Sequence, residues 1–505
     1  MKNNKEAMEE VREIVSKIRY LDSMDSLLYC DRWSVCPEEG FEYENLMSGF
    51  LTEMRNSLLV NKKVAGLVKQ FSGCAPSDFE DDLQRGQVNY LAWRYEDEVQ
   101  VSAKLRGRLN TACTQGQQAW EKSWKENDMK AFMPYMKTQF ELMGEIAHAI
   151  NPNEPPYQVL INRFDRGVRA EDLNHMFKSL KNEILSIMKE SEEAWDTVDF
   201  SILGVSPDKE TSRHLVAALQ DLLKFDKSRG VMYEAHHPVC SLVGPRDSRP
   251  STNYTALFQA LVGAAHESGH GMYNYNSPET LIKAGLWGGI EGTMHESQSK
   301  FYENMVYLSE EFWTAFLPLV KKSVPEMQGI SPREVAYALA KPKRQPVRLK
   351  ADELTVSLHI IIRYELERDY YEGRIKVEDL EEAWNEKYQE YLGIRPETSR
   401  EGILQDVHWA TGYIGYFQGY VLGSMYAAQF RHKLLEDVPD AWAYLAAGDI
   451  MPINNWLKNN VHQYGQIYTA EETLKKATGE SLNSQYFIEY LREKYLIKAP
   501  KALNL

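Results

Sequence analysis

Apolar residues recur three and four positions apart along most of the chain. Near the amino terminus this spacing runs from Met8 to Leu21, and the segment from Ser77 to Asn127 is one long, charged amphipathic run without proline. A period of 3.6 residues is typical of helices that bury one face. The run from Ser77 is long enough for two helices or for one very long helix. Further helices are predicted on the same grounds over residues 170–191, 212–227, 357–372 and 377–391.

Residues 230–254, GVMYEAHHPVCSLVGPRDSRPSTNY, depart from the helical pattern. Two pieces rich in β-branched residues flank the turn-forming sequence Gly-Pro-Arg-Asp, which predicts a small β hairpin. An exposed edge of this hairpin could hold an extended peptide by strand addition. The alternative is an irregular connection without function, and the pattern alone does not decide between them.

Residues 409–428, WATGYIGYFQGYVLGSMYAA, carry no charge, and their glycines include three at four-residue spacing. That spacing is typical of membrane helices that pack through small residues. However, the stretch is rich in tyrosine, directly follows polar residues and has no counterpart elsewhere in the chain. We therefore expect a buried helix in close contact with a neighbouring element.

These patterns together predict an all-α fold with one small β hairpin. Composition does not shift along the chain, and we find neither an internal repeat nor a low-complexity linker. We expect residues 1–505 to form a single domain, and two lobes flanking a cleft are compatible with that expectation.

The overall composition argues against some classes of partner. The 505 residues are 43% hydrophobic and 26% charged, as in ordinary globular proteins, and the formal net charge is −15. Because phosphate contacts need basic patches, this charge argues against nucleic-acid binding, and it makes anionic membrane surfaces poor partners. A peptide, which carries charges of both signs, is compatible with it.

The amino terminus and the cysteines favour a cytoplasmic location. Residues 1–24 lack the apolar core of a signal peptide. The five cysteines are scattered and form no C-x-x-C pair, which favours reduced thiols over a disulfide framework.

The sequence HESGH, from His266 to His270, carries the clearest chemical signal. On a helix, residues four apart lie on one face, so the two imidazoles could bind a single metal ion. Glu267 would lie one step around the helix, close enough to act on a water molecule at the ion. With 12 histidines in the chain, a chance match to H-E-x-x-H has odds on the order of a few per cent.

Two histidines do not complete a catalytic site, because catalytic zinc normally takes three protein ligands. Glu296 follows a glycine-rich turn and opens a new helical segment, which could return antiparallel to the first. Helix position favours Glu296, but spacing alone gives it only a modest advantage over Glu291. Glu303 and His295 are further rivals.

A site with two histidines and one glutamate indicates hydrolysis of a carbonyl compound. The ion lowers the pKa of its water and polarises the carbonyl, while Glu267 would move the proton to the leaving amine. The reaction also needs a donor for the developing oxyanion, for which Tyr413, Tyr416 and His408 are candidates. A structural metal in a binding protein is the alternative, but such sites usually have four ligands, and no cysteine lies near HESGH.

Together with HESGH, three motifs in the same order resemble those of the carboxypeptidase Taq family of metallocarboxypeptidases. HESQ at 295–298 is similar to the family's second metal motif, VRLKAD at 347–352 to its IRxxAD element, and GILQDVHW at 402–409 to GxxQDxHW. In that family the histidines of HExxH and the glutamate of HESQ bind the metal. The resemblance, which spans most of the chain, implies these ligands: His266, His270 and Glu296.

Three other positions depart from the family's pattern. Its HPF motif is HPV at 237–239, its DxRxT motif is DSRPS at 247–251, and Gln418-Gly419 replaces a common Pro-Thr pair. Loss of an aromatic side chain could change the shape of the pocket, whereas Ser251 keeps the hydroxyl group. None of these changes affects a metal ligand or Glu267, so they concern specificity.

The resemblance implies an elongated, mostly helical molecule with a deep central groove, similar to neurolysin and the angiotensin-converting enzymes. It implies release of single C-terminal residues from peptides, with broad specificity except at a C-terminal proline. It also implies a cytosolic homodimer that uses Zn²⁺, for which Co²⁺ can often substitute. A metallo-oligopeptidase that cuts internally within short peptides is the alternative, because it shares the fold.

An exopeptidase must bind the free C-terminal carboxylate, and the planar fork of arginine pairs with both oxygens. Arg348 and Arg249 lie in matched motifs and are the candidates, although each could instead form a structural salt bridge. Tyr416 resembles the later tyrosine of the YIRYF element in angiotensin-converting enzymes, which stabilises the oxyanion. The other residues predicted to act on substrate are His408, as a second donor, and His237 and Tyr413.

Overall fold

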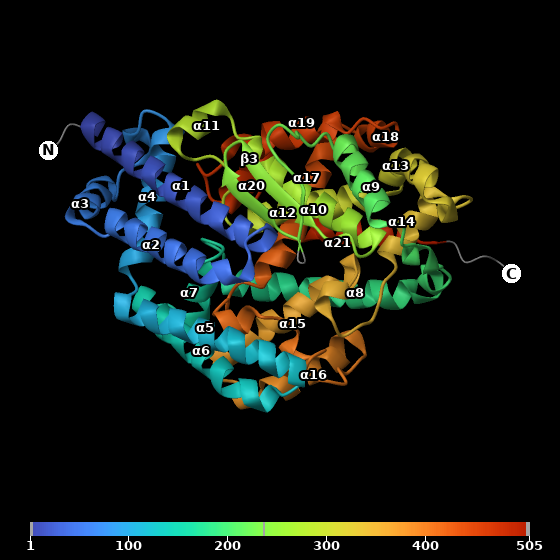
Figure 1. The fold of residues 1–505 in the computed structure, drawn as a ribbon, viewed down its shortest axis with the longest axis horizontal. Coiled ribbons are helices and arrows are strands. Elements are labelled where there is room, and N and C mark those ends of the chain that lie inside the picture. Colours follow the sequence, from blue (N-terminus) through green and yellow to red (C-terminus); the bar gives the residue numbers. More distant parts are fainter. Residues whose placement is uncertain (1–3, 236–237, 501–505) are drawn as a thin grey trace. The chain divides into compact units, whose positions relative to one another are not determined.

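The computed structural model describes residues 4–235 and 238–500, and helices dominate it (Figure 1). The chain divides into two compact units, each assembled from three stretches of sequence. The first unit comprises Met1–Val99, Ser201–Ala336 and Tyr426–Leu482, and the second comprises Gln100–Phe200, Tyr337–Met425 and Asn483–Leu505.

The predicted amphipathic helices are all present. The long run from Ser77 forms two helices, α4 (Asp82–Val99) and α5 (Ala103–Glu126), because Ser102 starts a new helix by accepting a hydrogen bond from the Leu105 amide. The other predicted segments are α1 (Asn4–Ser34), α8 (Ala170–Asp196), α9 (Lys209–Leu222), α15 (Glu353–Tyr371) and α16 (Leu380–Leu392).

The first unit packs its amino-terminal helices around one apolar core. The apolar stripe of α1, including Val11 and Ile18, meets Leu67 and Leu91 from two other helices. A fully buried side chain of this size contributes about 1.5–3 kcal/mol to stability. The remaining helices of this unit are α2 (Phe41–Leu59), α3 (Lys62–Phe71), α10 (Leu257–Tyr275), α11 (Glu279–Ala284), α12 (Gly292–Lys300), a π-helical segment (Phe301–Tyr307), α13 (Glu310–Ser323), α18 (Ala441–Ala446), α19 (Met451–Asn460) and α20 (Ala470–Thr478).

The predicted hairpin is confirmed and belongs to a three-stranded sheet. Strands β2 (Cys240–Gly244) and β3 (Asp247–Thr252) pair antiparallel, with Gly244 opposite Asp247 at the turn. The short strand β1 (Tyr233–Glu234) pairs parallel to β3, which gives the order β1-β3-β2. Helix α10 packs against β3, as Figure 1 shows, and α1 contacts β2. Strand addition by a peptide stays a prediction.

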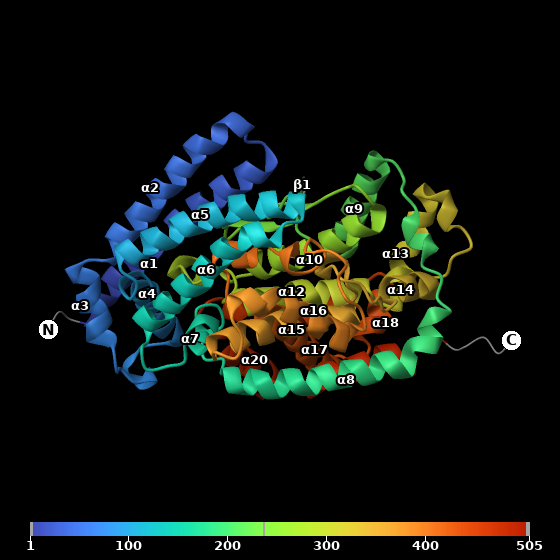
Figure 2. The ribbon, with the colours of Figure 1, turned by 90° about the horizontal axis from the view of Figure 1, so that it is seen from below.

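The second unit is built on the long, nearly straight helix α8, drawn along the lower edge of Figure 2. Helices α15 and α21 pack against α8, and α5 packs against α6. The remaining helices of this unit are α6 (Met129–Ile150), α7 (Pro156–Asn162), α21 (Gln485–Arg492) and a π-helical segment (Glu493–Ile497), while α14 (Pro332–Ala340) and α17 (Gln418–Asp437) cross the division between the units.

The prediction of one buried helix over residues 409–428 is wrong for its first half. A short 3-10 helix (His408–Thr411) and a loop precede α17, which begins at Gln418. Two glycines with positive φ lie in the break. Gly412, at +75°, ends the 3-10 helix, and at Gly415, at +79°, a Cβ would lie 2.7 Å from the Leu160 carbonyl carbon. Among the residues that the structure describes, we find no helix long and apolar enough to cross a membrane.

Candidate active site

HESGH lies within α10, in the first unit. Most residues of α10 before it are apolar and buried, and Leu257, Leu261 and Ala264 are fully buried. This buried segment packs against β3 and fixes the helix. As the spacing predicts, the rings of His266 and His270 are neighbours, with centroids 5.0 Å apart.

Helix α12 passes antiparallel to α10 at very short range. At Gly269 a Cβ would lie 2.6 Å from the Gln298 carbonyl oxygen and 2.9 Å from the Ser299 Cα. A residue with a side chain would force the helices apart. The glycine in HESGH therefore brings Glu296, which α12 carries, to the two histidines.

Two imidazole nitrogens and a carboxylate oxygen converge here. The Nε2 atoms of His266 and His270 lie 3.9 Å and 3.7 Å from Oε2 of Glu296. Glu267 is also near, with Oε1 at 3.9 Å from Nε2 of His266, and the ligand atoms of Glu267 and the histidines all lie within 4.8 Å of one another. Because Glu296 approaches both histidines this closely, the geometry favours Glu296 as the third ligand.

The residues present fit a divalent metal ion. Two ligand atoms at about 2.1 Å from a tetrahedral ion lie about 3.4 Å apart. The separations of 3.7 Å and 3.9 Å exceed that spacing only slightly, so small side-chain movements would complete the coordination. Two imidazoles and one carboxylate also form a donor set that suits zinc and leave a position open for water.

Contacts behind the imidazoles orient both rings. Nδ1 of His266 lies 2.6 Å from Oε2 of Glu303, and the backbone of His295 hydrogen-bonds the His270 side chain. Glu303, the rival candidate for the third ligand, therefore contacts Nδ1 of His266, whereas Nε2 of that ring faces Glu296. The ring of His295 packs between His270 and Tyr273.

Burial and neighbouring carboxylates shift the pKa values of this cluster. Burial raises the pKa of Glu267 to about 7, with His266 opposing the shift and Glu296 adding to it. Burial would lower the pKa of His266, but the carboxylates of Glu296 and Glu303 outweigh it and raise the pKa to about 9. A metal ion would displace that proton, since ligation requires neutral imidazole.

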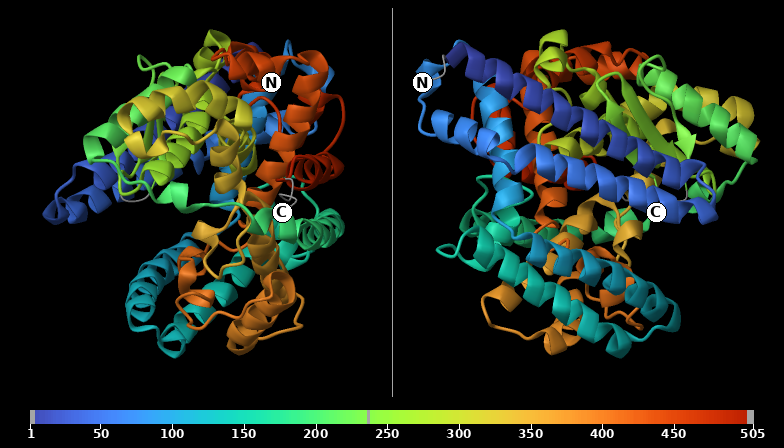
Figure 3. Two further views of the ribbon diagram at one scale, coloured as in Figure 1. Left: turned by 90° about the vertical axis from the view of Figure 1, so that its right-hand side faces the viewer. Right: turned by 60° about the vertical axis from the view of Figure 1, so that its left-hand side comes forward.

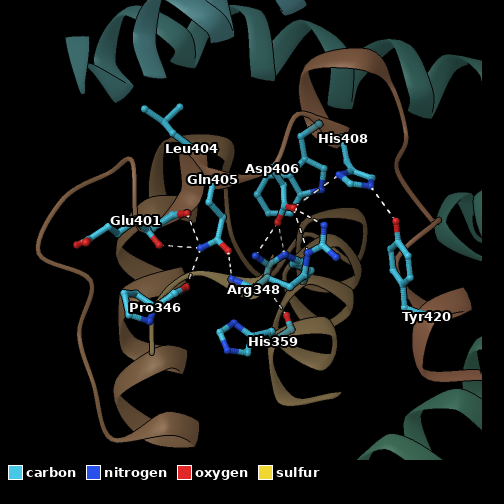
Figure 4. Close-up of polar contacts among 12 residues, drawn as sticks. Pro346, Arg348, His359, Glu401, Leu404, Gln405, Asp406, His408 and Tyr420 are labelled. Atoms are coloured by element: carbon cyan, nitrogen blue, oxygen red, sulfur yellow. Dashed lines mark hydrogen bonds and ion pairs between the residues drawn. The ribbon is translucent and has the colours of Figure 1, made fainter. Parts of the chain in front are cut away.

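A second cluster of predicted residues lies in the second unit (Figure 4). Arg348 donates from Nε and Nη2 to Oδ1 of Asp406, at 3.1 Å and 2.8 Å. The fully buried Arg363 donates from Nε to the other oxygen of Asp406, at 2.6 Å. The two guanidinium groups hold the pKa of Asp406 far below its usual range, although burial opposes them. Asp406 thus stays charged and fixes Arg348.

Gln405 links the segment that contains Arg348 to the segment that contains Asp406. Its side-chain oxygen accepts from the Arg348 amide at 2.7 Å, and its amide group donates to the carbonyls of Pro346 and Glu401 at 2.9 Å and 2.7 Å (Figure 4). Both Gln405 and Asp406 lie inside a motif that the sequence reveals. Their roles were missed because a motif does not show which side chains meet.

His408 and the tyrosines form an aromatic group beside Asp406. The ring of His408 stacks on Tyr416, with centroids 5.7 Å apart, and Tyr413 packs edge-on against Tyr416. Nε2 of His408 lies 3.4 Å from the Tyr420 hydroxyl, a partner that the sequence did not single out. Burial lowers the pKa of His408 to about 4, although Asp406 opposes it, so the ring is neutral at pH 7.

Arg249 and His237 are the last two residues predicted to bind substrate. Arg249 on β3 pairs with Asp247 through Nε and Nη2, at 2.9 Å and 2.8 Å. His237 lies outside the described residues. Each candidate arginine thus already pairs with a carboxylate of the chain, and its role toward substrate stays a prediction.

Comparison with known proteins decides the family. The model of the carboxypeptidase Taq (M32) metallopeptidase family matches residues 10–495. This chain belongs to that family. Carboxypeptidase 1 of Bacillus subtilis is 33% identical over 493 residues, which cover 96% of this chain and 97% of that protein. The predicted family resemblance is confirmed.

Solved structures confirm the fold class of this M32 carboxypeptidase. A crystal structure of M32 carboxypeptidase from Deinococcus radiodurans is similar with a TM-score of 0.92 and 28% identity, covering 97% of this chain and 98% of that chain. A carboxypeptidase structure from Pyrococcus furiosus has a TM-score of 0.93 and 28% identity, covering 98% and 100%. The protein is therefore a helical metallocarboxypeptidase, a peptide hydrolase whose family uses a divalent metal ion.

Proposed function

We propose that His266, His270 and Glu296 hold a zinc ion in a site that removes single C-terminal residues from peptides. The convergence of Glu296 on both Nε2 atoms carries the assignment of the ligands. When bound, the ion lowers the pKa of water and polarises the scissile carbonyl, and Co²⁺ should substitute for Zn²⁺.

Glu267 moves the proton in this mechanism. Its carboxylate accepts the proton of the attacking water and delivers it to the leaving amine nitrogen. Burial raises the pKa of Glu267, which is the direction that helps a carboxylate hold a proton and then donate it. Its side chain is 8% exposed, which limits exchange of that proton with solvent.

Further side chains are proposed to bind the substrate and to stabilise the oxyanion. Arg348 is assigned to the C-terminal carboxylate of the substrate. Its hydrogen bonds to Asp406 use Nε and Nη2, so Nη1 takes no part in that pair. Arg249 is the second candidate and leaves Nη1 out of its pair with Asp247 in the same way. The remaining assignments are Tyr416 and His408 as donors to the oxyanion, and Tyr413 and His237 as residues that line the substrate site.

The specificity is proposed on the family resemblance. We infer broad tolerance of C-terminal side chains with poor cleavage of a C-terminal proline. Pro238-Val239, where the family has Pro-Phe, and Gln418-Gly419, where it has Pro-Thr, are the positions at which preference would differ among relatives. A cytoplasmic location, favoured by the reduced cysteines, belongs to the same proposal.

We also infer a homodimer, supported by exposed apolar stripes on α1 and α2, which lie side by side in the right-hand view of Figure 3. Six large side chains of these stripes are 45–68% exposed: Tyr20, Met24, Tyr43, Leu46, Phe50 and Met54. At roughly 100 Å² each they offer about 600 Å², most of the ~800 Å² per partner of a standard interface. A second copy offers the same apolar surface in return.

The double substitution Leu46→Glu with Phe50→Glu is expected to convert the dimer to a monomer, because four charges would face one another across the interface. Sedimentation velocity should show twice the chain mass for the wild type and the chain mass for the variant. Leu319→Glu, an exposed leucine on α13, is the control and should stay dimeric. A wild type that is monomeric, or a variant that stays dimeric, would contradict this interface.

The activity is tested with a blocked dipeptide bearing a free C-terminus, beside its C-terminal amide. We expect release of the C-terminal amino acid from the acid but not from the amide, with Zn²⁺ or Co²⁺, and no release after chelation. Amino-acid analysis of the products measures this result. Equal cleavage of both compounds, or internal cleavage of longer peptides alone, would favour the metallo-oligopeptidase instead.

A further inference from the structure

Glu303 lies behind the proposed metal ligands, on the far side of one imidazole. Its Oε2 is 2.6 Å from Nδ1 of His266, while Nε2 of the same ring faces Glu296 at 3.9 Å. The two ring nitrogens of an imidazole point in different directions, so a carboxylate on Nδ1 does not compete with a ligand on Nε2. The sequence allowed Glu303 as a metal ligand, but this contact gives it a different task.

The backbone places Glu303 at this position. Glu296 lies in α12, and the chain continues without a break into the π-helical segment Phe301–Tyr307. Both helical segments pack against α10, so two carboxylates seven residues apart reach opposite sides of one histidine. Single π-helical turns inside helices are frequent at functional sites, because they re-aim side chains.

Lys300 contacts the same carboxylate oxygen of Glu303 as His266 does. Its Nζ lies 2.8 Å from Oε2 of Glu303 and 4.0 Å from Oε1 of Glu296. The side chains of Lys300 and Glu303 are 15% and 19% exposed, so this pair is largely screened from water. An ionised Glu303 can only accept a hydrogen bond, and Nδ1 of His266 must therefore carry the proton.

We propose that Glu303, held by Lys300, is a positioning residue that fixes His266 as the tautomer protonated on Nδ1 and presents the Nε2 lone pair for metal binding. Histidine ligands commonly have such a carboxylate partner, and its loss typically weakens metal binding 10- to 100-fold. The inference rests on the proposed metal site, and it predicts an effect on affinity that is smaller than the loss of a ligand.

Zinc affinity of the full chain, measured by competition with a chromophoric chelator, tests this role. We expect Glu303→Ala to weaken Zn²⁺ binding about 10- to 100-fold and Glu303→Gln, which keeps a neutral acceptor, to weaken it less. Glu310→Gln, an exposed glutamate on α13 that pairs with Arg333, is the matched control and should bind as the wild type does. The absorption spectrum of the Co²⁺-loaded protein should shift in Glu303→Ala, because His266 loses the group that orients it, and should shift less in Glu303→Gln.

Two results would overturn the inference. Wild-type zinc affinity in both Glu303 variants would show that the contact does not position His266, and loss as complete as in His270→Ala would make Glu303 a ligand. Should Glu303→Ala not fold, the isosteric Glu303→Gln decides alone. Retention of wild-type zinc affinity in His270→Ala would instead contradict the proposed metal site itself, so the two failures are distinguishable.

Discussion

Glu267→Gln is expected to lower kcat about 10³-fold while the protein keeps its metal. Glutamine has nearly the same shape but cannot accept the proton of the attacking water, and general-base catalysis contributes about 10²–10⁴-fold. Glu296 approaches the Nε2 atoms of both histidines within 4 Å, whereas the recorded approach of Glu267 is to His266 alone, so we expect the ligand set to survive the substitution. Kinetics on the blocked dipeptide, with metal content determined on the same samples, measure both quantities.

The metal measurement separates two explanations of an inactive variant. If Glu267→Gln loses zinc as His270→Ala should, then Glu267 is a ligand, as its distance of 3.9 Å from Nε2 of His266 would allow. If the variant keeps full activity, Glu267 has no part in proton transfer. Only loss of turnover with retention of metal agrees with a general base.

Arg348→Ala is expected to raise KM for free-acid peptides by about 10²-fold with a smaller change in kcat. Removing one partner of a buried, hydrogen-bonded charge pair costs about 2–5 kcal/mol. The pair between Arg348 and the substrate carboxylate exists in both the ground state and the transition state, so its loss affects mainly KM. The fold should persist, because Asp406 keeps its 2.6 Å hydrogen bond from Arg363. Steady-state kinetics on the acid and on its amide measure the effect, which should be confined to the acid.

Comparison with the other candidate arginine tests the assignment. Arg249→Ala removes a side chain that pairs with Asp247 on the same strand, and we expect a smaller change in KM than for Arg348→Ala. Arg348→Lys should recover part of the affinity, since it keeps the charge but loses the planar fork. An unchanged KM in Arg348→Ala would move carboxylate recognition elsewhere, with Arg249 the next candidate.

Local patterns carried much of the fold prediction. Apolar spacing predicted helices α1, α4, α5, α8, α9, α15 and α16, and the Gly-Pro-Arg-Asp turn predicted the hairpin. Periodicity and turn chemistry act between residues close in sequence. The failure over residues 409–417 has a nonlocal cause. Gly415 adopts a positive φ and lies against the Leu160 backbone, a contact between residues far apart in the chain.

The sequence by itself determined the family, the reaction class and the pair of histidines, because H-E-x-x-H spacing on a helix fixes its own geometry. Only the tertiary structure decided that Glu296 approaches both Nε2 atoms while Glu303 contacts Nδ1. It also showed that Asp406 holds Arg348 and Arg363 together. The physical reason is that each of these contacts depends on how close separate segments approach, as at Gly269 against Gln298, and that distance is set by packing across the whole unit.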